Sequence, residues 1–229
     1  MEYIYDGFKQ ALILLFSGDL SVYSAIKTTL FTSSVSIFLA FIIGFPLGFT
    51  IGYFNFKGKN LIKLIVNTSL SFPTVAIGLI LYAFISQKGP FGNLNLLFTT
   101  KALILGQTIL ALPIIIALFS NLIENMDKKH FLLIKSYHLN KINLILTIIY
   151  ELRYNLISVI ALAYGRIVAE VGVAMIIGGN IKYDTRTITT AISLETNKGE
   201  FSSGIALALV LITISFCLNF IIHKVKKKQ

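Results

Sequence analysis

Long stretches without a charged side chain constrain this chain more than any other feature. Residues 28–56, 64–87, 102–123 and 201–222 carry no charge, and residues 154–181 carry only Arg166 and Glu170. A transmembrane helix needs about 20 predominantly apolar residues. The pattern therefore predicts five transmembrane helices, at residues 26–54, 62–86, 102–124, 153–178 and 201–223.

The composition supports the same class of protein. Hydrophobic residues make up 55% of the chain and charged residues 13%, against about 25% charged in a typical soluble domain. This excludes a disordered chain, a coiled coil and a conventional nucleic-acid-binding domain. We predict an all-α integral membrane protein, with residues 1–229 forming a single transmembrane domain surrounded by membrane lipid.

The N-terminal segment has a different pattern from the five spans. Only nine uncharged residues separate Lys9 from Asp19, which is too few to cross a bilayer. Apolar side chains recur here at helical spacing, at Tyr3, Ile4, Phe8, Leu12 and Leu15. An interfacial amphipathic helix over residues 3–17 is therefore expected.

The basic residues predict the orientation of the bundle. The formal net charge is +10, and basic side chains gather at 57–63, 128–153 and 224–228, which five spans place on one side. Lys and Arg are enriched in cytoplasmic loops. The prediction is a multi-pass membrane protein with its N-terminus outside and its C-terminus inside. Residues 125–152 then form a cytoplasmic loop and residues 179–200 an extracytoplasmic loop.

The motifs of a self-powered or catalytic protein are missing. The string nearest to a phosphate-binding loop, residues 52–60, has the wrong glycine spacing and Asn60 in place of the hydroxyl residue. His130, His138 and His223 do not show the spacing of zinc ligands. We expect no catalytic residue, no metal site, no cofactor and no ATPase site, and therefore a chain that is not an enzyme.

Arg166 and Glu170 stand out because they lie in the middle of the fourth predicted span. Four residues apart, they share one helix face and can pair. A charge at the bilayer centre costs a few kcal/mol even on lenient scales, so both should face protein or water. Two interpretations stay open: a buried pair that fixes helix packing, and a position on a translocation path.

Two loops are candidates for contacts outside the membrane. The amphipathic middle of the cytoplasmic loop, residues 130–149, is either a passive interfacial helix or an element that docks a partner. The outer loop carries a run of donors without a paired acid, which suits a small oxyanion or is simply solvated. The residues are Gly178, Gly179, Asn180, Thr185, Arg186 and Thr187.

Three segments resemble a known family. Residues 71–92, residues 104–117 and above all residues 163–196, with a G-R-x-x-x-E-x-G segment and a G-G-N-I-x-x-x-T-R-T loop, carry the likeness. The chain resembles the permease subunit of bacterial ABC importers, in the molybdate/tungstate/sulfate oxyanion branch, and the tungstate permeases most of all. In position, the long cytoplasmic loop matches the EAA loop of that family, with residues 134–136 in place of EAA and Asn140 in place of its glycine.

The resemblance implies the type-1 permease fold of ABC importers, a location in the bacterial plasma (inner) membrane and a function in ATP-driven import of an oxyanion. It implies a homodimer that encloses the anion path, separate cytoplasmic ABC ATPase subunits and an extracytoplasmic oxyanion-binding protein. Arg166 and Glu170 would line or brace the path, and the outer loop would lie near the binding protein. A coupling helix would dock into the ATPase through Ile134, Lys135, Ser136, Tyr137, His138, Leu139 and Asn140.

Alternatives remain for both substrate and class. Molybdate or sulfate permeases are the alternatives within the family. An ion-gradient-driven anion transporter should carry coupling carboxylates in several spans, whereas only Glu170 is clearly buried in one. A purely structural membrane subunit would leave the long cytoplasmic loop and the outer Arg/Thr loop without a role.

Overall fold

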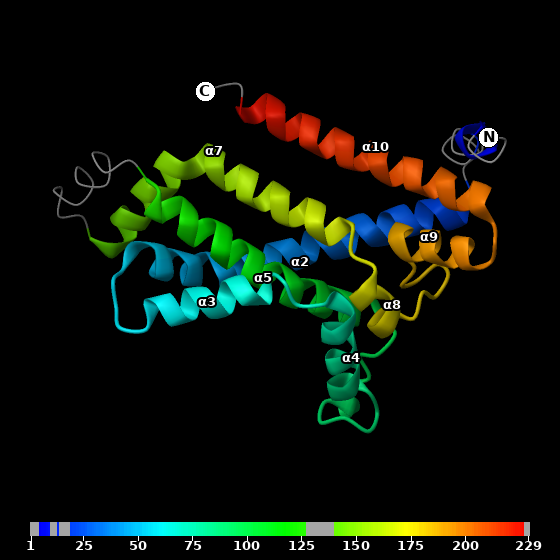
Figure 1. Ribbon diagram of the computed structural model, residues 1–229, viewed down its shortest axis with the longest axis horizontal. Helices are drawn as coiled ribbons and strands as arrows, with labels where there is room; N and C mark the ends of the chain where they lie inside the picture. Colours follow the sequence, from blue (N-terminus) through cyan, green and yellow to red (C-terminus); the bar gives the residue numbers. More distant parts are fainter. Residues whose placement is uncertain (1–4, 10–12, 14–18, 127–139, 227–229) are drawn as a thin grey trace.

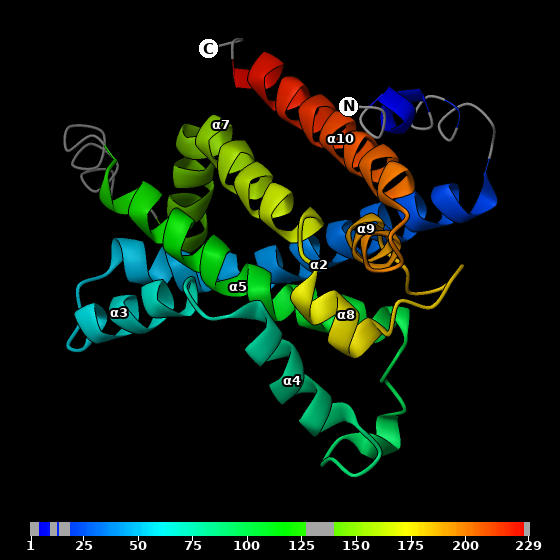
Figure 2. The ribbon, with the colours of Figure 1, turned by 45° about the vertical axis from the view of Figure 1, so that its right-hand side comes forward.

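The structure is a computed structural model that describes residues 5–9, 13, 19–126 and 140–226. Every regular element among these residues is a helix (Figures 1 and 2). The α-helices are α2 (Leu20–Tyr53), α3 (Lys59–Ser69), α4 (Thr74–Ile85), α5 (Thr100–Glu124), α7 (Lys141–Val168), α8 (Gly172–Gly178), α9 (Ile188–Asn197) and α10 (Phe201–Lys226). A short 3-10 helix, η1, covers Gly92–Leu94.

Three of these helices, α2, α5 and α7, are long and apolar enough to cross a membrane. The pair α3 and α4 adds a fourth span if the two are counted together, and the apolar described part of α10, Phe201–Cys217, is shorter. The prediction of an all-helical membrane protein is therefore confirmed. The number of five spans stays a prediction, as do the orientation and the helix at 3–17, of which residues 5–9 are helical.

The two ends of the bundle collect different parts of the chain (Figure 1). Helices α2 and α5 finish at the end where α3 and α7 begin, which we call the inner end. The starts of α2, α5 and α10 lie at the opposite, outer end, together with α9. The inner end is the one that the basic residues predict to be cytoplasmic.

Small residues let α2 and α5 pack closely. Ala40, Gly44, Gly48 and Gly52 recur at every fourth position of α2 and are buried against α5. A Cβ placed on Gly52 would lie 2.8 Å from Cβ of Ile123 and 2.9 Å from the carbonyl oxygen of Ser120. Small residues four apart allow two helix backbones to approach in this way.

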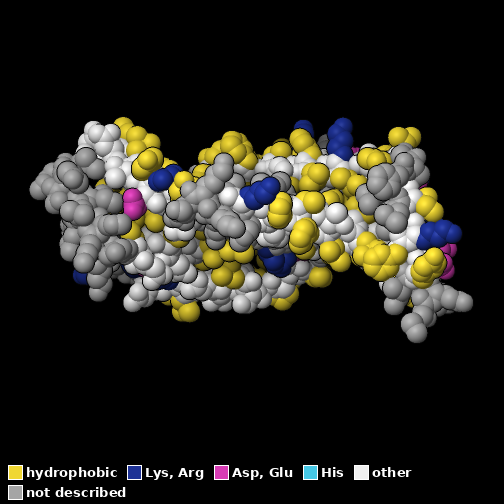
Figure 3. Space-filling model, turned by 90° about the horizontal axis from the view of Figure 1, so that it is seen from above, with side chains coloured by type: hydrophobic (Ala, Val, Ile, Leu, Met, Phe, Trp, Pro, Cys, Tyr) yellow, Lys and Arg dark blue, Asp and Glu magenta, His cyan; other side chains and the backbone are white. Residues whose placement is uncertain are grey.

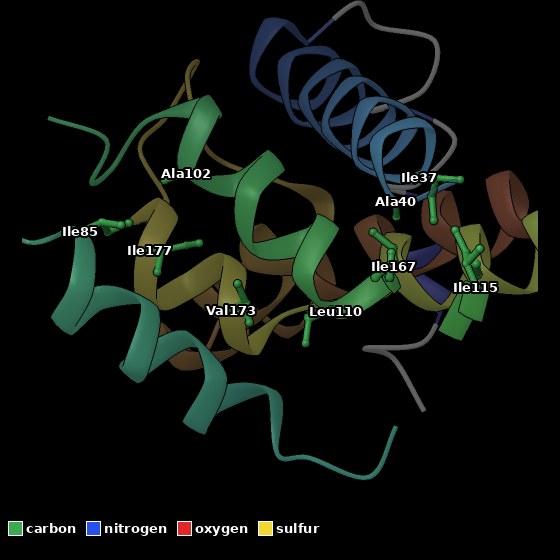
Figure 4. Close-up of a cluster of buried hydrophobic side chains, with 11 residues drawn as sticks. Ile37, Ala40, Ile85, Ala102, Leu110, Ile115, Ile167, Val173 and Ile177 are labelled. Atoms are coloured by element: carbon green, nitrogen blue, oxygen red, sulfur yellow. The ribbon is translucent and has the colours of Figure 1, made fainter. Parts of the chain in front are cut away.

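A second set of contacts gathers five helices around one apolar cluster (Figure 4). Ile37 and Ala40 come from α2, and Leu110 and Ile115 from α5. Ile85 of α4, Ala102 of α5, Ile167 of α7, and Val173 and Ile177 of α8 complete the labelled set. The cluster fixes α8 and the end of α4 against the long helices.

The second predicted helix, at 62–86, is not continuous. Residues 70–73 separate α3 from α4, and the two helices are bent by 96°. Pro73 is the residue at the break, and proline disfavours helical backbone in the residue before it. As a result α3 runs along α5, whereas α4 turns away from the bundle in both views (Figures 1 and 2).

The fourth predicted helix, at 153–178, also differs from the structure. Helix α7 begins at Lys141, inside the predicted loop 125–152, and ends at Val168; α8 starts after a break at residues 169–171. The start follows from Asn140, whose Oδ1 accepts a hydrogen bond from N–H of Asn143 at 2.9 Å and caps the helix. The predicted outer loop, 179–200, likewise contains α9, which Thr187 caps through a capping box.

Candidate functional site

The break between α7 and α8 holds the two charged residues of the fourth predicted span. Nη1 of Arg166 donates to Oε2 of Glu170 at 3.0 Å. The side chain of Glu170 is 2% exposed, whereas that of Arg166 is 51% exposed. The expected pair is therefore present, and it is asymmetric: a buried carboxylate holds a guanidinium that reaches the surface of the single chain.

Glu170 also organises the surrounding backbone. Its Oε1 accepts from N–H of Val173 at 3.2 Å, so the carboxylate caps the start of α8. Its carbonyl oxygen accepts from Oγ1 of Thr189 at 2.8 Å, which ties the break to α9. A carboxylate at a helix N-terminus is favourable because free N–H groups and the helix dipole attract negative charge. One buried acid thus positions Arg166, α8 and α9 together.

The two helix breaks lie side by side. A Cβ on Gly172 would lie 2.7 Å from Oγ1 of Thr74 and 3.0 Å from N of Val75, so the start of α8 touches the start of α4. Gly78, one turn further along α4, approaches Cα of Val173 in the same way, at 3.1 Å. Residues 70–73 are exposed in the single chain. Non-helical backbone at membrane depth is tolerated only where protein or a water-filled cavity covers it.

The predicted anion-binding residues of the outer loop are bonded to one another. Nε of Arg186 donates to Oδ1 of Asn180 at 3.1 Å, and Nη2 donates to the carbonyl oxygen of Asn180 at 3.3 Å. Oγ1 of the buried Thr185 donates to the carbonyl oxygen of Gly178 and accepts from N–H of Ile181 at 3.0 Å. These contacts use several donors of the loop to hold its own shape.

Thr187 and the turn at Gly179 complete this loop. Thr187 is buried and caps α9, with its Oγ1 accepting from N–H of Thr190 at 3.2 Å. Gly179 ends α8 at φ 69°, a left-handed conformation that suits glycine, with Phe98 packed against it. The exposed part of the loop is residues 181–184, which sequence reasoning did not single out.

Residues of the predicted coupling segment are described only at its end. Ile134, Lys135, Ser136, Tyr137, His138 and Leu139 lie outside the described residues. Asn140, the last residue of the predicted coupling segment, is the N-cap of α7. The segment therefore ends where this helix begins.

An ion-pair cluster at the inner end was missed by the sequence analysis. Glu124 at the end of α5 accepts from Nζ of Lys59 at 2.9 Å and from Nζ of Lys63, both on α3. The residues are about 60 positions apart, so no spacing rule could connect them. The cluster ties α3 to the point where α5 leads into the predicted coupling segment.

Apolar side chains are exposed on α4 and α10. Val75, Leu79 and Ile80 of α4 are exposed, as are Ile212 and Phe216 of α10. Hydrophobic side chains are also spread along the face seen in Figure 3, with scattered basic ones between them. Such surfaces are typical of contact with lipid or with another protein.

Comparisons with known proteins agree with this architecture. Residues 44–229 match the family model described as binding-protein-dependent transport system inner membrane component. A tungstate uptake system permease protein, TupB of Campylobacter jejuni, is 78% identical over 227 residues, which cover 99% of this chain and 95% of that protein. TupB of Peptoclostridium acidaminophilum is 36% identical over 228 residues and the whole of both chains.

A more distant relative and a solved structure extend the comparison. The molybdenum transport system permease protein ModB of Azotobacter vinelandii is 24% identical, over 89% of this chain and 94% of that one. A structure of the MetNI methionine ABC transporter in an inward-facing conformation superposes with a TM-score of 0.73 at 16% identity, covering 91% of this chain and 95% of that chain. At this identity the likeness concerns the fold alone.

These findings confirm the predicted ABC importer permease fold and the prediction of a transport subunit that is not an enzyme. The family description also implies residence in the inner membrane and dependence on a binding protein. The matched residues, 44–229, make up far more than half of the chain and begin within α2. The chain belongs to the family of binding-protein-dependent transport system inner membrane components.

Proposed function

We propose that this chain is the membrane subunit of an ATP-driven importer of tungstate. The observation that carries the proposal is the 78% identity, over almost the whole chain, to a permease named for tungstate uptake. Separate cytoplasmic ATPase subunits supply the energy, and an extracytoplasmic binding protein delivers the oxyanion. Molybdate and sulfate are the alternative substrates, because more distant relatives are named as permeases for molybdenum and for sulfate.

We further propose that two copies of the chain enclose the path. The exposed, non-helical residues 70–73 support this, because backbone that lipid cannot satisfy needs protein or water beside it. Leu79 of α4, 62% exposed, adds an apolar surface next to the break. Leu79→Lys should weaken the dimer, which the mass of the detergent-solubilised complex measures.

In this proposal Arg166 contacts the anion and Glu170 orients it. One nitrogen of Arg166 is used by Glu170, and half of the side chain is exposed. A guanidinium presents five donors and suits an oxyanion geometrically. The negative charge of Glu170 offsets the positive charge of Arg166, so the anion binds more weakly than it would to an unpaired arginine and can be released.

The outer loop, in turn, is proposed as the contact with the binding protein or the anion. Gly178, Gly179, Asn180, Thr185, Arg186 and Thr187 form its bonded base, and residues 181–184 its exposed part. Arg186→Ala should lower uptake of tungstate and leave the complex assembled. Normal uptake by the assembled Arg186→Ala variant would remove Arg186 from the list of anion contacts.

The segment Ile134–Asn140 is proposed to dock into the ATPase subunit. Lys135→Glu combined with Asn140→Trp should reduce recovery of the ATPase with the affinity-tagged permease. Lys198→Glu, on the outer side, serves as a matched charge-reversal control. Unchanged recovery in the double variant would contradict docking through this segment.

Reconstitution tests the function itself. The chain is co-expressed with an ABC ATPase subunit and an oxyanion-binding protein from the same organism, purified as a complex and placed in liposomes with ATP. Tungstate, molybdate and sulfate are supplied in turn with the binding protein, and ATP hydrolysis and anion uptake are measured. Tungstate should stimulate both at the lowest concentration. Uptake by the permease alone, driven by an ion gradient, would support the secondary transporter instead.

A further inference from the structure

An apolar groove lies between α7 and α10. Helix α10 is on the outside of the bundle, beside α7, in both ribbon views (Figures 1 and 2). The groove has a volume of about 200 Å³, and its lining from α7 includes Ile157, Ile160 and Val168. Ser215 and Asn219 line it from α10, and none of its described lining residues is charged. An exposed apolar surface of this kind suits an apolar occupant.

The groove has room for part of a hydrocarbon chain. A Cβ placed on Gly165, one of the lining residues, would meet nothing within 4 Å. Nδ2 of Asn219 donates to the carbonyl oxygen of Ser215 at 3.0 Å, so this amide nitrogen already has a partner within α10. An apolar cavity of about 150 Å³ is large enough to bind benzene. The groove can therefore hold several carbon atoms of an acyl chain.

Arg153 lies on the groove face of α7, one helical turn closer to the inner end. Successive residues of an α-helix are rotated by about 100°, so Arg153 falls within about 40° of Ile157 and about 20° of Ile160 and Tyr164. Along the helix axis it is about 6 Å beyond Ile157. Glu151, the acidic residue of α7, is rotated by about 160° from Arg153 and lies on the other side of the helix. The groove face of α7 therefore ends in a positive charge without an acid beside it on that face.

The guanidinium of Arg153 has further hydrogen-bond donors to offer. Its Nη1 donates to the carbonyl oxygen of Tyr150, and its Cζ lies 4.2 Å from the ring centroid of Tyr150 and 4.5 Å from that of Tyr154. Within the described part of the chain no carboxylate pairs with Arg153. A guanidinium carries five N–H donors and binds phosphate through two of them at once. Tyrosines gather where the hydrocarbon core meets the lipid head groups, which is the level of a lipid phosphate.

The end of α10 adds positive charge beyond the groove. Helix α10 runs antiparallel to α7, and Lys224 lies about 7.5 Å further towards the inner end than Asn219. Lys224 is exposed, with its Nζ 4.9 Å from the ring centroid of Phe220. In the sequence, four of the last six residues are lysines, and residues 201–229 contain no Asp or Glu. Basic side chains at helix ends on the cytoplasmic side are typical of sites for anionic lipid head groups.

We propose that the α7–α10 groove and Arg153 together bind an anionic phospholipid in the leaflet at the inner end. The lipid phosphate accepts hydrogen bonds from Arg153, and one acyl chain lies along Ile157, Ile160 and Gly165. The lysines at the end of α10 favour a lipid with a net negative charge. The site goes beyond the proposed function, because it concerns the lipid around the chain and not the anion that is transported.

Stabilisation by added lipid is the first test. The full-length chain is purified with its ATPase subunits, stripped of lipid in detergent and titrated with phosphatidylglycerol or phosphatidylcholine while its thermal unfolding is followed. Phosphatidylglycerol should raise the midpoint at a lower concentration than phosphatidylcholine. Arg153→Gln should raise the phosphatidylglycerol concentration at half effect about tenfold, in line with the loss of a charge-assisted hydrogen bond. Arg153→Lys should raise it less. Lys57→Gln, which removes an exposed charge at the inner end, is the control and should match wild type.

Filling the groove is the second test, and it concerns the acyl chain. Gly165→Leu places a side chain in the groove and should reduce the phosphatidylglycerol that stays bound in native mass spectrometry. Thr213→Leu is the matched control, because Thr213 is exposed and rotated by about 160° from Ser215 on α10. Glycerol 3-phosphate, which has the phosphate and no acyl chain, should not raise the unfolding midpoint at the concentrations where phosphatidylglycerol does.

Three outcomes would contradict the lipid site. Equal stabilisation of the wild-type complex by the two lipids would do so, and this comparison needs no variant that assembles. Stabilisation by glycerol 3-phosphate as strong as that by phosphatidylglycerol would indicate a site for a free anion instead. A smaller mass of the Gly165→Leu complex with unchanged lipid retention would assign the groove to a contact between two copies of the chain. Tungstate uptake enters none of these measurements, so the lipid site can fail while the proposed function stands.

Discussion

Arg166 and Glu170 form an ion pair in which only one partner is buried. The nitrogen and oxygen are 3.0 Å apart, the glutamate side chain is 2% exposed and that of the arginine is 51% exposed. A buried carboxylate is costly unless paired and hydrogen-bonded, and Glu170 has both Arg166 and N–H of Val173 as donors. The arginine thus satisfies the acid and still presents donors on the exposed face of α7.

Substitutions in this pair should reduce transport more than stability. Arg166→Ala and Glu170→Gln are each expected to lower anion uptake about tenfold, because a hydrogen bond to a charged group contributes about 1.5–3 kcal/mol. Arg166→Lys should give a partial loss, since lysine keeps the charge and loses the planar donor arrangement. Uptake by the reconstituted complex is the measurement, with Lys198→Ala of the exposed Lys198–Glu195 pair as control. Normal uptake by assembled Arg166→Ala would place the pair outside the path.

The packing of α2 on α5 predicts opposite effects of the same substitution at two glycines. Gly52→Ala should destabilise the protein by about 1–3 kcal/mol, because its Cβ would meet Ile123 and Ser120 at 2.8–2.9 Å. Gly165→Ala meets nothing within 4 Å and should stabilise α7 by up to about 1 kcal/mol. Thermal unfolding in detergent measures both. Equal midpoints for the two variants would show that the α2–α5 contact is looser than described.

Asp19 predicts a pH dependence at the start of α2. Its carboxylate accepts from N–H of Ser21 at 2.7 Å and of Val22 at 3.2 Å. The hydrogen bond from the Ser21 hydroxyl, followed by those from the two backbone N–H groups, holds the pKa of Asp19 below its ordinary value despite some desolvation. A lowered pKa in the folded state means that the contribution is complete above the ordinary pKa, near 4, and is lost as pH falls through the lower folded value.

The comparison of wild type with Asp19→Ala checks this cap. At pH 7 the variant should be less stable by about 0.5–2 kcal/mol, as for other lost helix caps. The difference should shrink as the pH falls below about 4, because protonation weakens the wild-type cap. Asp19→Asn keeps an oxygen acceptor and should lose less. A difference between wild type and Asp19→Ala that is constant from pH 7 to pH 3 would contradict the role of the carboxylate.

The cluster of Glu124 with Lys59 and Lys63 predicts a coupling defect. Glu124→Lys should separate α3 from the end of α5. Adding Lys63→Glu should restore part of the contact, because the charges of that pair are then reversed and attract again. Partly exposed pairs contribute about 0.2–1 kcal/mol each, so the loss of stability should be small. The more sensitive measurement is ATP hydrolysed per anion imported, which should rise in Glu124→Lys. Lys57→Glu is the control; an equal rise there would remove any special role of the cluster.

The positions of the outer-loop residues illustrate how sequence and structure divide the information. Thr185, Thr187 and Arg186 were singled out as donors for an anion, and the structure bonds Thr185 to Gly178 and Arg186 to Asn180. Their residue types show only that donors are present. Which acceptor each donor meets depends on the left-handed turn at Gly179 and Asn180, which brings the two ends of the loop together.

The breaks in the helices show the same division. Uncharged length predicted continuous helices at 62–86 and 153–178, because hydropathy does not register a change of direction. Pro73 was a visible sign of the first break. The second break depends on Glu170 capping Val173 and on Gly172 touching Thr74, and the latter contact joins residues almost 100 positions apart.

The sequence alone determined that the chain lies in a membrane, its helical class and its family resemblance, and it placed Arg166 and Glu170 on one helix face where they can pair. Those features follow from local composition and from spacing along one helix, which hydrocarbon length and helical periodicity translate directly into structure. Only the tertiary structure decided that the two breaks meet, that Glu124 binds two lysines of α3 and that an apolar groove lies between α7 and α10. Each of these joins distant parts of the chain, and such contacts depend on how small residues let whole helices approach one another.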